Sequence, residues 1–485
     1  MNILLASSEV FPFSKTGGLA DMAGALGKAL AEDGHNVTIV TPLYRGIREK
    51  HRSIKPTEMV FDLPLGGERR TARVWQREED PHRRICFIDQ PDFYDRPALY
   101  LENGRDYPDN AARFIFFSKC SVELARVLPE KTELVHVHDW QPGLIPLMIR
   151  HERRAGSWKG APASVLTIHN LAYQGVFPRD EYNLTNLPWD YFHPYGAEFY
   201  GQMNCLKAGI IYADMITTVS PRYAREITTE QYGCGLDGVL RSRQDRLVGI
   251  LNGVDYSEWN TETNPFLKFH YSIENLAGKR LQKLALQEEM DLPVDERIPL
   301  FGTVSRLADQ KGVDIQIAAL EEMLSTNMQF VLLGSGDPNF ERAFRELAGR
   351  HPGKVAVRIG YDHGLAHRIE AGCDFFIMPS RFEPCGLNQM YSLRYGTIPI
   401  VRVTGGLDDS VTDLTEDLDA ADGIKFFEYS SRALAKAIRK ALVLYGNPDL
   451  LEHLRINAMQ ADFSWEHTTH EYERVFKRAL RLRGT

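Results

Sequence analysis

The stretch "KTGGLAD", Lys15 to Asp21, lies between an apolar run, "NILLAS" (residues 2–7), and a segment of helical periodicity that reaches Gly34. A short apolar run predicts a buried strand, whereas apolar residues three and four positions apart predict an amphipathic helix. The glycine pair therefore marks a turn from a first strand into a first helix.

The same four-residue core returns in "VTGGLDD", Val403 to Asp409, again after a strand-like run, "IPIVRV" (residues 398–403). A glycine pair at a helix start can simply permit an unusual backbone conformation. It can also let the backbone approach an anion at the positive end of the helix. Because the glycine pair occurs twice in the same sequence context, and Lys15 lies beside the first pair, we favour anion binding. The candidate backbone groups are those of Gly17, Gly18, Gly405 and Gly406.

Short apolar runs of this kind recur along the whole chain and alternate with helical patterns. Examples are "NVTIVTP" (36–42), "LVHVHD" (134–139), "SVLTIH" (164–169), "LFGTVS" (300–305) and "DFFIMPS" (374–380). Most are nearly continuous in apolar residues, as expected for parallel strands buried on both faces. The sequence therefore predicts an α/β protein built from doubly wound, Rossmann-like domains.

The length of the chain and one polar segment indicate two such domains. A chain of 485 residues is longer than chains that fold around a single hydrophobic core. We expect an N-terminal domain over residues 1–250, a turn-rich hinge over 251–265 and a C-terminal domain over 266–462. The last segment, 463–485, gathers apolar residues on one helical face. We expect it to dock back on the N-terminal domain rather than to contact a membrane.

Composition excludes several classes of protein. A formal net charge of −8 argues against a general binder of nucleic acid or of membrane surfaces. No apolar run approaches the length of about 18 residues that a membrane span needs. The six cysteines are scattered without a CxxC pair, which disfavours a zinc ribbon or a disulfide framework. We expect a cytoplasmic protein without a signal peptide.

Two cations follow the strand that would open the second domain. In "FGTVSRLADQKGVD" (residues 301–314), Arg306 and Lys311 are five residues apart. The planar guanidinium of an arginine and the ammonium group of a lysine can bind the same diphosphate. The chain lacks GxxxxGK[ST] and a tight GxGxxG after its first strand, which disfavours a P-loop NTPase and a dehydrogenase.

Histidines mark the ends of two further strands. "LVHVHDW" places His136 and His138 on one strand face beside Asp139, which suggests a metal site or a polar cluster that orients a substrate. The further histidines of a fuller metal pattern are missing nearby, so we favour the polar cluster. In "LTIHNLAYQG", His169 and Asn170 follow a strand, and Asn170 suits a hydroxyl-rich ligand.

A dense loop follows the strand that ends near residue 378. "SRFEPCGLNQ" (residues 380–389) combines Ser380, the carboxylate of Glu383, the thiol of Cys385 and nearby backbone amides. Cys385 could act as a nucleophile, but no histidine stands beside it in the sequence. The loop is better suited to accept a hydrogen bond from a sugar hydroxyl or to stabilise a charge, and Glu383 is the candidate for this role.

Taken in order, "KTGGLAD", "HVHDW", "TIHNLAYQG", "LNGVD", "SRLADQKG", "SRFEPCGLNQ" and "VTGGLDDSV" resemble the bacterial glycogen synthase and plant starch synthase family over nearly the whole chain. The resemblance implies a glycosyltransferase B fold, with two Rossmann-like domains facing across a deep cleft. It also implies transfer of glucose from ADP-glucose to the non-reducing end of an α-1,4-glucan such as glycogen, with retention of configuration and no metal cofactor.

The same resemblance assigns roles to individual residues. It places Lys15 and the Gly17–Gly18 amides near the nucleotide sugar, Arg306 and Lys311 on the diphosphate, and Tyr361 on adenine. The implied catalytic residues are Glu383, His169, Lys15, Arg306, Lys311 and Asp139. The implied substrate-binding residues are Lys15, Gly17, Gly18, Asp21, Asn170, Asn252, Tyr361, Ser380, Cys385, Gly386, Leu387, Gly405 and Gly406.

Three departures from the family pattern stand out. Asn388 replaces a more usual threonine, the turn at residues 259–265 is longer, and residues 422–426 contain less glycine. We expect these changes to affect the hinge and the acceptor side more than the donor site. Two other functions stay open, namely a related transferase that uses UDP-glucose with a small acceptor, and a catalytically silent protein that binds glucan or nucleotide.

Overall fold

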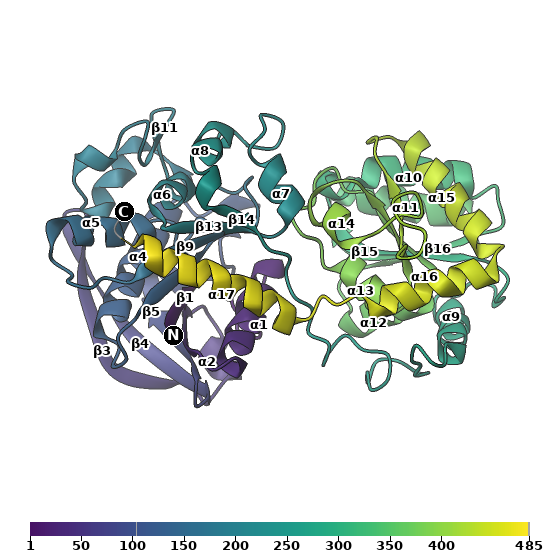
Figure 1. The fold of residues 1–485 in the computed structure, drawn as a ribbon, viewed down its shortest axis with the longest axis horizontal. Coiled ribbons are helices and arrows are strands. Elements are labelled where there is room, and N and C mark those ends of the chain that lie inside the picture. The colour runs from purple at the N-terminus through teal and green to yellow at the C-terminus, as the bar shows by residue number, and fades with distance from the viewer. Residues whose placement is uncertain (103, 484–485) are drawn as a thin grey trace. The chain divides into compact units, whose positions relative to one another are not determined.

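The structure is a computed structural model that describes residues 1–102 and 104–483. The chain divides into two compact units, each of which is an α/β sandwich (Figure 1). Unit 1 comprises Met1–Val219, Ala224–Gly253 and Trp465–Thr485, and unit 2 comprises Ser220–Tyr223 and Val254–Ser464. Both units contain parallel strands, as the continuous apolar runs predicted.

The main sheet of unit 1 is centred on the first strand, β1, which pairs in parallel with β2 and β8. In the described part of the unit the strand order is β14-β13-β9-β8-β1-β2-β5-β4-β3. The strands are β1 (Asn2–Ala6), β2 (Asn36–Pro42), β3 (Lys55–Leu65), β4 (Glu68–Asp80), β5 (Arg83–Asp89), β8 (Leu134–His138), β9 (Ala163–Ile168), β13 (Met215–Thr218) and β14 (Leu247–Gly249).

Strands β3 and β4 extend this sheet in an antiparallel hairpin that the sequence patterns did not predict. Continuous apolar runs marked the other strands, whereas β4 is rich in charge and buries mainly alternate residues such as Ala72 and Val74. A strand with one solvent-exposed face shows a period of two instead of a continuous run. Unit 1 therefore has a mixed sheet.

Helices and short elements complete unit 1. The helices are α1 (Gly18–Glu32), α2 (Ile47–Lys50), α3 (Pro91–Tyr94), α4 (Asn110–Val127), α5 (Ile145–Ala155), α6 (Cys205–Tyr212), α7 (Pro221–Glu226, which runs from unit 2 into unit 1), α8 (Asp237–Ser242) and α17 (Trp465–Leu482). Short 3-10 helices are η1 (Arg179–Thr185), η2 (Trp189–Tyr191) and η3 (Gln244–Arg246). Minor strands are β6 (Leu101–Glu102), β7 (Arg105–Asp106), β10 (Val176–Phe177), β11 (Glu198–Phe199) and β12 (Gln202–Asn204).

The last helix, α17, packs in unit 1 against α1, β9 and β13. Its buried face carries Tyr472, Val475, Phe476 and Ala479. These are apolar residues of the face that the sequence pattern picked out, and the arginines and lysines of the helix lie mostly on the other side.

Unit 2 contains a parallel sheet with the order β17-β16-β15-β18-β19-β20. The strands are β15 (Leu300–Leu307), β16 (Gln329–Gly336), β17 (Val355–Ile359), β18 (Phe375–Met378), β19 (Ile398–Arg402) and β20 (Ile424–Phe426). The helices are α9 (Ala277–Glu289), η4 (Asp309–Lys311, a 3-10 turn), α10 (Val313–Met323), α11 (Pro338–Arg350), α12 (His363–Gly372), α13 (Asn388–Arg394), α14 (Gly405–Ser410), α15 (Ser431–Tyr445) and α16 (Pro448–Gln460).

Both faces of this sheet are covered by helices. Phe301 and Phe330 belong to a core shared with α10, α11, α15 and α16. Their neighbours Leu300 and Val331 belong to a second core shared with α9 and α12. Successive residues of a strand point to opposite faces, so a strand buried on both sides reads as continuously apolar.

Apart from the short segment Ser220–Tyr223 of unit 2, the chain passes between the units at two points that lie side by side. It leaves unit 1 after Gly253 and returns after Ser464. Val254 forms a parallel bridge with Ser464, and its N–H donates to the Phe463 carbonyl at 2.7 Å. The bending expected over residues 251–265 stays a prediction.

One further observation concerns membranes. Among the helices of residues 1–102 and 104–483, none combines the length and the apolar character that crossing a bilayer requires.

Candidate active site

The residues singled out from the sequence share one position in the fold, because they lie near the carboxyl ends of parallel strands or in the loops that follow them. In unit 1 the segments concerned follow β1, β8, β9 and β14, and in unit 2 they follow β15, β17, β18 and β19. Ligands of open α/β sheets bind at this end of the strands, where helix N-termini point toward them. Each unit therefore presents one edge with candidate binding groups.

The loop before α1 is held by a buried carboxylate that the sequence motifs did not single out. Glu9 accepts hydrogen bonds from the Thr16 N–H, from Thr16 Oγ1 at 2.6 Å and from the Tyr100 hydroxyl at 2.7 Å. Lys15 extends from this loop, with Nζ 2.8 Å from Asp21 Oδ1 in the first turn of α1. A carboxylate directly after a buried strand, in "SSEV", is the signal that could have found Glu9.

The two Thr-Gly-Gly-Leu segments, residues 16–19 and 404–407, need glycine for different reasons. Gly17 has φ −158°, an extended conformation open to any residue, and a Cβ there would meet no atom within 4 Å. Gly405 has φ +43°, and its Cβ would collide with the Glu383 carbonyl, as that of Gly406 would with the Cys385 carbonyl. Backbone conformation and packing therefore explain why residues 405 and 406 are glycines, but they do not explain Gly17.

Asp139 joins two strand ends of unit 1. It follows β8 with φ +61°, and its Oδ1 accepts the His169 N–H at 2.7 Å. Burial raises the pKa of Asp139 to about 7, against the opposing effect of N–H donors from His169 and Asn170. The Asn170 side chain accepts the Ala172 N–H at 3.0 Å and so shapes its own loop. The structure therefore brings Asp139, His169 and Asn170 together.

His136 and His138 of β8 are buried, and the half-buried His169, which follows β9, lies beside them. His138 Nδ1 lies 3.0 Å from His169 Nε2, and His136 Nε2 lies 2.6 Å from Thr167 Oγ1. Burial lowers the pKa of His136 and His169 to about 3 and that of His138 well below its usual value. All three are neutral at pH 7. The side-chain groups in the described residues with geometry suited to a metal lie elsewhere.

In unit 2, Glu383 is the centre of the loop after β18. This buried carboxylate accepts Lys311 Nζ at 2.6 Å and Ser380 Oγ at 2.9 Å. Lys311 reaches it because Gly312, with φ +71°, packs closely against the Pro379 carbonyl. Arg306 is exposed and has no ion-pair partner among residues 1–102 and 104–483. The structure thus pairs Lys311 with Glu383 and leaves Arg306 facing solvent.

The backbone amides of this loop are fixed by a residue that the sequence motifs did not mark. Gln389 donates from Nε2 to the carbonyls of Cys385 and Gly386, at 3.1 and 2.9 Å, and contacts Ser410 Oγ at 3.0 Å. Leu387 caps the helix that follows. Burial of Cys385 argues against a reactive nucleophile at this position.

Asn388 links two elements of unit 2. Its side-chain amide donates to the Val304 carbonyl at 2.6 Å and ties the start of α13 to β15, the strand that carries Arg306. The expected effect of this departure on the hinge and the acceptor side stays a prediction.

Two other candidates have informative surroundings. Tyr361, between β17 and α12, has an exposed fraction of 81%, so its ring is available for stacking. Asn252 is buried, and its Oδ1 has no hydrogen-bond partner in the part of the chain that the structure describes. A buried unpaired acceptor is costly unless a ligand or water satisfies it.

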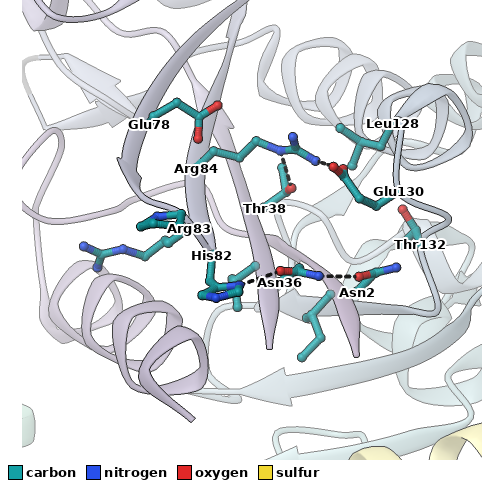
Figure 2. Close-up of a pocket in the computed structure, with 13 residues that line it drawn as sticks. Asn2, Asn36, Thr38, Glu78, His82, Arg83, Arg84, Leu128, Glu130 and Thr132 are labelled. Atoms are coloured by element: carbon teal, nitrogen blue, oxygen red, sulfur yellow. Dashed lines mark hydrogen bonds and ion pairs between the residues drawn. The ribbon is translucent and has the colours of Figure 1, made fainter. Parts of the chain in front are cut away.

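A pocket in unit 1 lies at the wrong end of the strands to be this site (Figure 2). It is lined by Asn2, Asn36 and Arg84, which stand at the amino ends of β1, β2 and β5. Its polar groups bind one another, as Arg84 Nε donates to Thr38 Oγ1 at 2.9 Å and Asn36 to Asn2 at 3.0 Å. None of the candidate residues lines it.

Comparison with known proteins agrees with this arrangement. Residues 2–242 match the family model "Starch synthase catalytic domain", and residues 287–460 match "Glycosyl transferases group 1". The chain is 46% identical to the glycogen synthase of Anaeromyxobacter sp. (strain Fw109-5), over 98% of this chain and 99% of that protein. It is 47% identical to the glycogen synthase of Myxococcus xanthus (strain DK1622), with the same coverage.

Solved structures give the same result. The catalytic domain of starch synthase IV from Arabidopsis thaliana, bound to ADP and acarbose, superposes with a TM-score of 0.89 at 32% identity and covers 99% of both chains. The fold is also shared with the sucrose-phosphate synthase of Thermosynechococcus elongatus, at a TM-score of 0.61 and 17% identity. From its sequence, its fold and its relatives, this chain belongs to the glycogen synthase and starch synthase family of glycosyltransferases.

Proposed function

We propose that this enzyme transfers glucose from ADP-glucose to the non-reducing end of an α-1,4-glucan such as glycogen, with retention of configuration and without a metal cofactor. The observation that carries this proposal is the buried cluster of Glu383, Lys311 and Ser380 at one strand end. It places a carboxylate suited to sugar hydroxyls beside a cation suited to phosphate. Membership of the family supports the proposal, as do the ADP and acarbose bound to the Arabidopsis starch synthase.

We propose that three cations and the N-terminus of α1 bind the diphosphate of the donor. Lys15, Arg306 and Lys311 carry positive charge at strand ends, and charge-assisted hydrogen bonds to phosphate are about twice as strong as neutral ones. Gly17, with Gly18 behind it, leaves room for a phosphate oxygen at the N-terminus of α1. In this proposal Asp21 holds Lys15 in position until the donor binds.

The transferred glucose is assigned to groups of both units. Departure of the diphosphate leaves an oxocarbenium-like centre, which a nearby carboxylate stabilises. We give this role to Glu383, and we give hydroxyl contacts to Asp139, Asn252 and the amides of the loop at 385–387. A pKa of about 3 makes the His169 ring a weak proton acceptor, so we assign it to positioning the sugar through its ring and backbone carbonyl and not to general-base catalysis.

Two finer assignments complete the proposal. Tyr361 stacks on adenine, and the leaving diphosphate accepts the proton of the attacking glucan hydroxyl. The enzyme works in the cytoplasm, an assignment supported by six cysteines that form no disulfide.

A donor panel tests the proposed function. The purified chain is incubated with radiolabelled ADP-glucose or UDP-glucose, with or without glycogen, in buffer containing EDTA. We expect glucan-dependent release of ADP, slower transfer from UDP-glucose, and full activity in EDTA. Transfer from UDP-glucose to a small sugar would instead support the related-transferase alternative. Nucleotide release that does not depend on added glucan would refute the synthase assignment.

A further inference from the structure

Unit 2 contains a cluster of metal-ligating side chains that the transfer reaction does not use. His363 and His367 are the first and fifth residues of α12, so their side chains share one face of the helix. Glu258 comes from the turn that follows the crossing into unit 2, where its N–H donates to the Asp255 carbonyl at 3.1 Å. Two segments far apart in the sequence therefore converge at this point.

Three ligand atoms of the cluster face a common centre. Glu258 Oε1 lies 3.0 Å from His363 Nε2 and 4.0 Å from His367 Nε2, and the two Nε2 atoms are 3.3 Å apart. A tetrahedral zinc ion with bonds of about 2.0–2.1 Å separates its ligand atoms by roughly 3.3 Å. The three measured distances bracket that value, so one ion fits without a change of backbone.

The buried ligand, His367, is held in a fixed orientation. Its ring stacks on Trp259 at 4.0 Å and on Phe266 at 5.1 Å between ring centres. Its other nitrogen, Nδ1, lies 2.8 Å from the Tyr395 hydroxyl, which can accept an N–H from it, and 3.0 Å from the Asn264 amide nitrogen. A hydrogen bond of this kind fixes the tautomer and orientation of metal-binding histidines.

Asn264 supports both segments of the cluster. Its buried amide nitrogen donates to the Glu258 carbonyl at 3.0 Å and to the Tyr395 hydroxyl at 2.8 Å. The remaining charge nearby is balanced, because Arg368 is paired with Glu289 through two contacts of 2.7 Å. Since the side chains of Glu258 and His363 are 40% and 41% exposed, an ion can enter from solvent and keep a water ligand.

The donor set selects the class of ion. Two imidazole nitrogens and one carboxylate oxygen suit zinc and its transition-metal neighbours, whereas magnesium and calcium prefer oxygen ligands alone. We propose that Glu258, His363 and His367 bind one zinc-class divalent cation, which ties residues 255–264 to α12 as a structural site outside the transfer reaction.

The test uses the full chain, stripped with EDTA and desalted. It is titrated with Co²⁺, whose visible absorption reports tetrahedral coordination, and then with Zn²⁺ to displace it. We expect one equivalent to bind and the unfolding temperature to rise with Zn²⁺. His363→Ala and Glu258→Gln, on different segments, should each weaken binding by at least roughly 10- to 100-fold, the range that loss of even an outer hydrogen-bond partner costs.

Two histidine variants serve as matched controls. His351→Ala removes a part-exposed histidine of unit 2 that lies 3.3 Å from Glu321, and His35→Ala breaks the other possible cluster, formed with Asp33 and Glu473. Both should leave the bound equivalent and its spectrum unchanged. The proposal is wrong if the wild-type chain binds no Co²⁺ or Zn²⁺, or if His363→Ala and Glu258→Gln bind as the wild type does. A chain that binds zinc but fails the donor panel would leave this site intact and refute only the proposed function.

Discussion

At Glu383, one buried carboxylate holds both a lysine and a serine, so its charge and its hydrogen-bonding capacity can be separated by mutation. Glu383→Gln keeps the shape and loses the charge. We expect a loss in kcat of roughly 10- to 150-fold, equivalent to the 1.5–3 kcal/mol of one charged hydrogen bond, with little change in KM for ADP-glucose. Steady-state kinetics with glycogen measures this.

Glu383→Ala is the companion variant and should lose more turnover than Glu383→Gln. Near-normal turnover in the glutamine variant alone would mean that the hydrogen bond suffices without the charge. If the alanine variant were also active, Glu383 would be a structural residue of its loop and the site assignment would fail.

Gly17 can be tested without disturbing the fold, because its φ suits any residue and its Cβ would meet open space. Gly17→Ala should keep its unfolding free energy within about 0.5 kcal/mol. If the backbone approaches a phosphate, KM for ADP-glucose should rise by roughly tenfold, the equivalent of one charge-assisted hydrogen bond. Kinetics and urea unfolding provide the two measurements.

Gly405→Ala is the structural counterpart, since its φ is positive and its Cβ would collide with the Glu383 carbonyl. This variant should lose about 1–3 kcal/mol of stability together with turnover. An unchanged KM in a well-folded Gly17→Ala variant would remove Gly17 from the proposed donor site.

His169 offers a prediction on pH dependence. Burial lowers its pKa from 6.5 to about 3, so its folded-state pKa lies below its unfolded value. The stability that the neutral ring contributes is present above pH 6.5 and is lost as pH falls toward 3. His169→Ala should therefore unfold with a weaker pH dependence below pH 6.5, measured by urea titration.

Turnover of the same variant separates positioning from proton transfer. We expect kcat to fall while the acidic limb of the pH–rate profile stays in place, because a ring that is neutral throughout this range does not titrate there. Selective loss of that limb would make His169 a titrating catalyst.

At the scale of elements, a buried ion cluster joins two helices to the sheet of unit 2. Asp374, just before β18, accepts Lys283 of α9 and Arg455 of α16, each at 2.7 Å, and the Leu300 N–H at 2.9 Å. Burial raises the pKa of Asp374, but Lys283 and Arg455 outweigh it and the net pKa is lowered. The stabilisation is therefore present above pH 3.8 and is lost as pH falls further.

Asp374→Asn leaves the buried Lys283 and the half-buried Arg455 without their counter-ion. We expect the unfolding free energy of unit 2 to fall by about 3–5 kcal/mol at neutral pH, measured by denaturant unfolding. Asp291→Asn is the matched control, because Asp291 is an exposed residue 3.7 Å from Arg358. Equal stability of the two variants would contradict the role given to the buried cluster.

At the scale of the whole molecule, the proposed ligands of ADP-glucose belong to both units, and two of the points at which the chain passes between the units are adjacent. We propose that the donor favours a more closed arrangement, with bending within residues 251–265. Small-angle scattering should show a smaller radius of gyration with ADP-glucose than without it. An unchanged radius at saturating donor would count against the hinge, and Arg306→Ala should need more donor for the same change.

The α/β class and the expected parallel strands were predicted correctly from the sequence, and the comparisons confirm the family. The antiparallel pair β3 and β4 was missed, because a half-exposed strand carries charge on one face. The roles of single residues stay predictions. Glu9 and Gln389 were not singled out from the sequence, although the carboxylate in "SSEV" was a signal for Glu9, because their contacts with backbone groups and hydroxyls form only in the folded chain.

The sequence by itself determined the buried parallel strands, the glycine turns and the family, because these depend on neighbouring residues and on the order of motifs along the chain. Only the tertiary structure decided which distant groups meet: Lys311 with Glu383, 72 residues apart, and the Asp139 carboxylate with the His169 backbone, 30 residues apart. It also decided their ionisation, since a pKa such as that of Asp139 or His169 depends on burial. Burial and long-range contact arise only when the strands have paired and the helices have closed over both faces of a sheet.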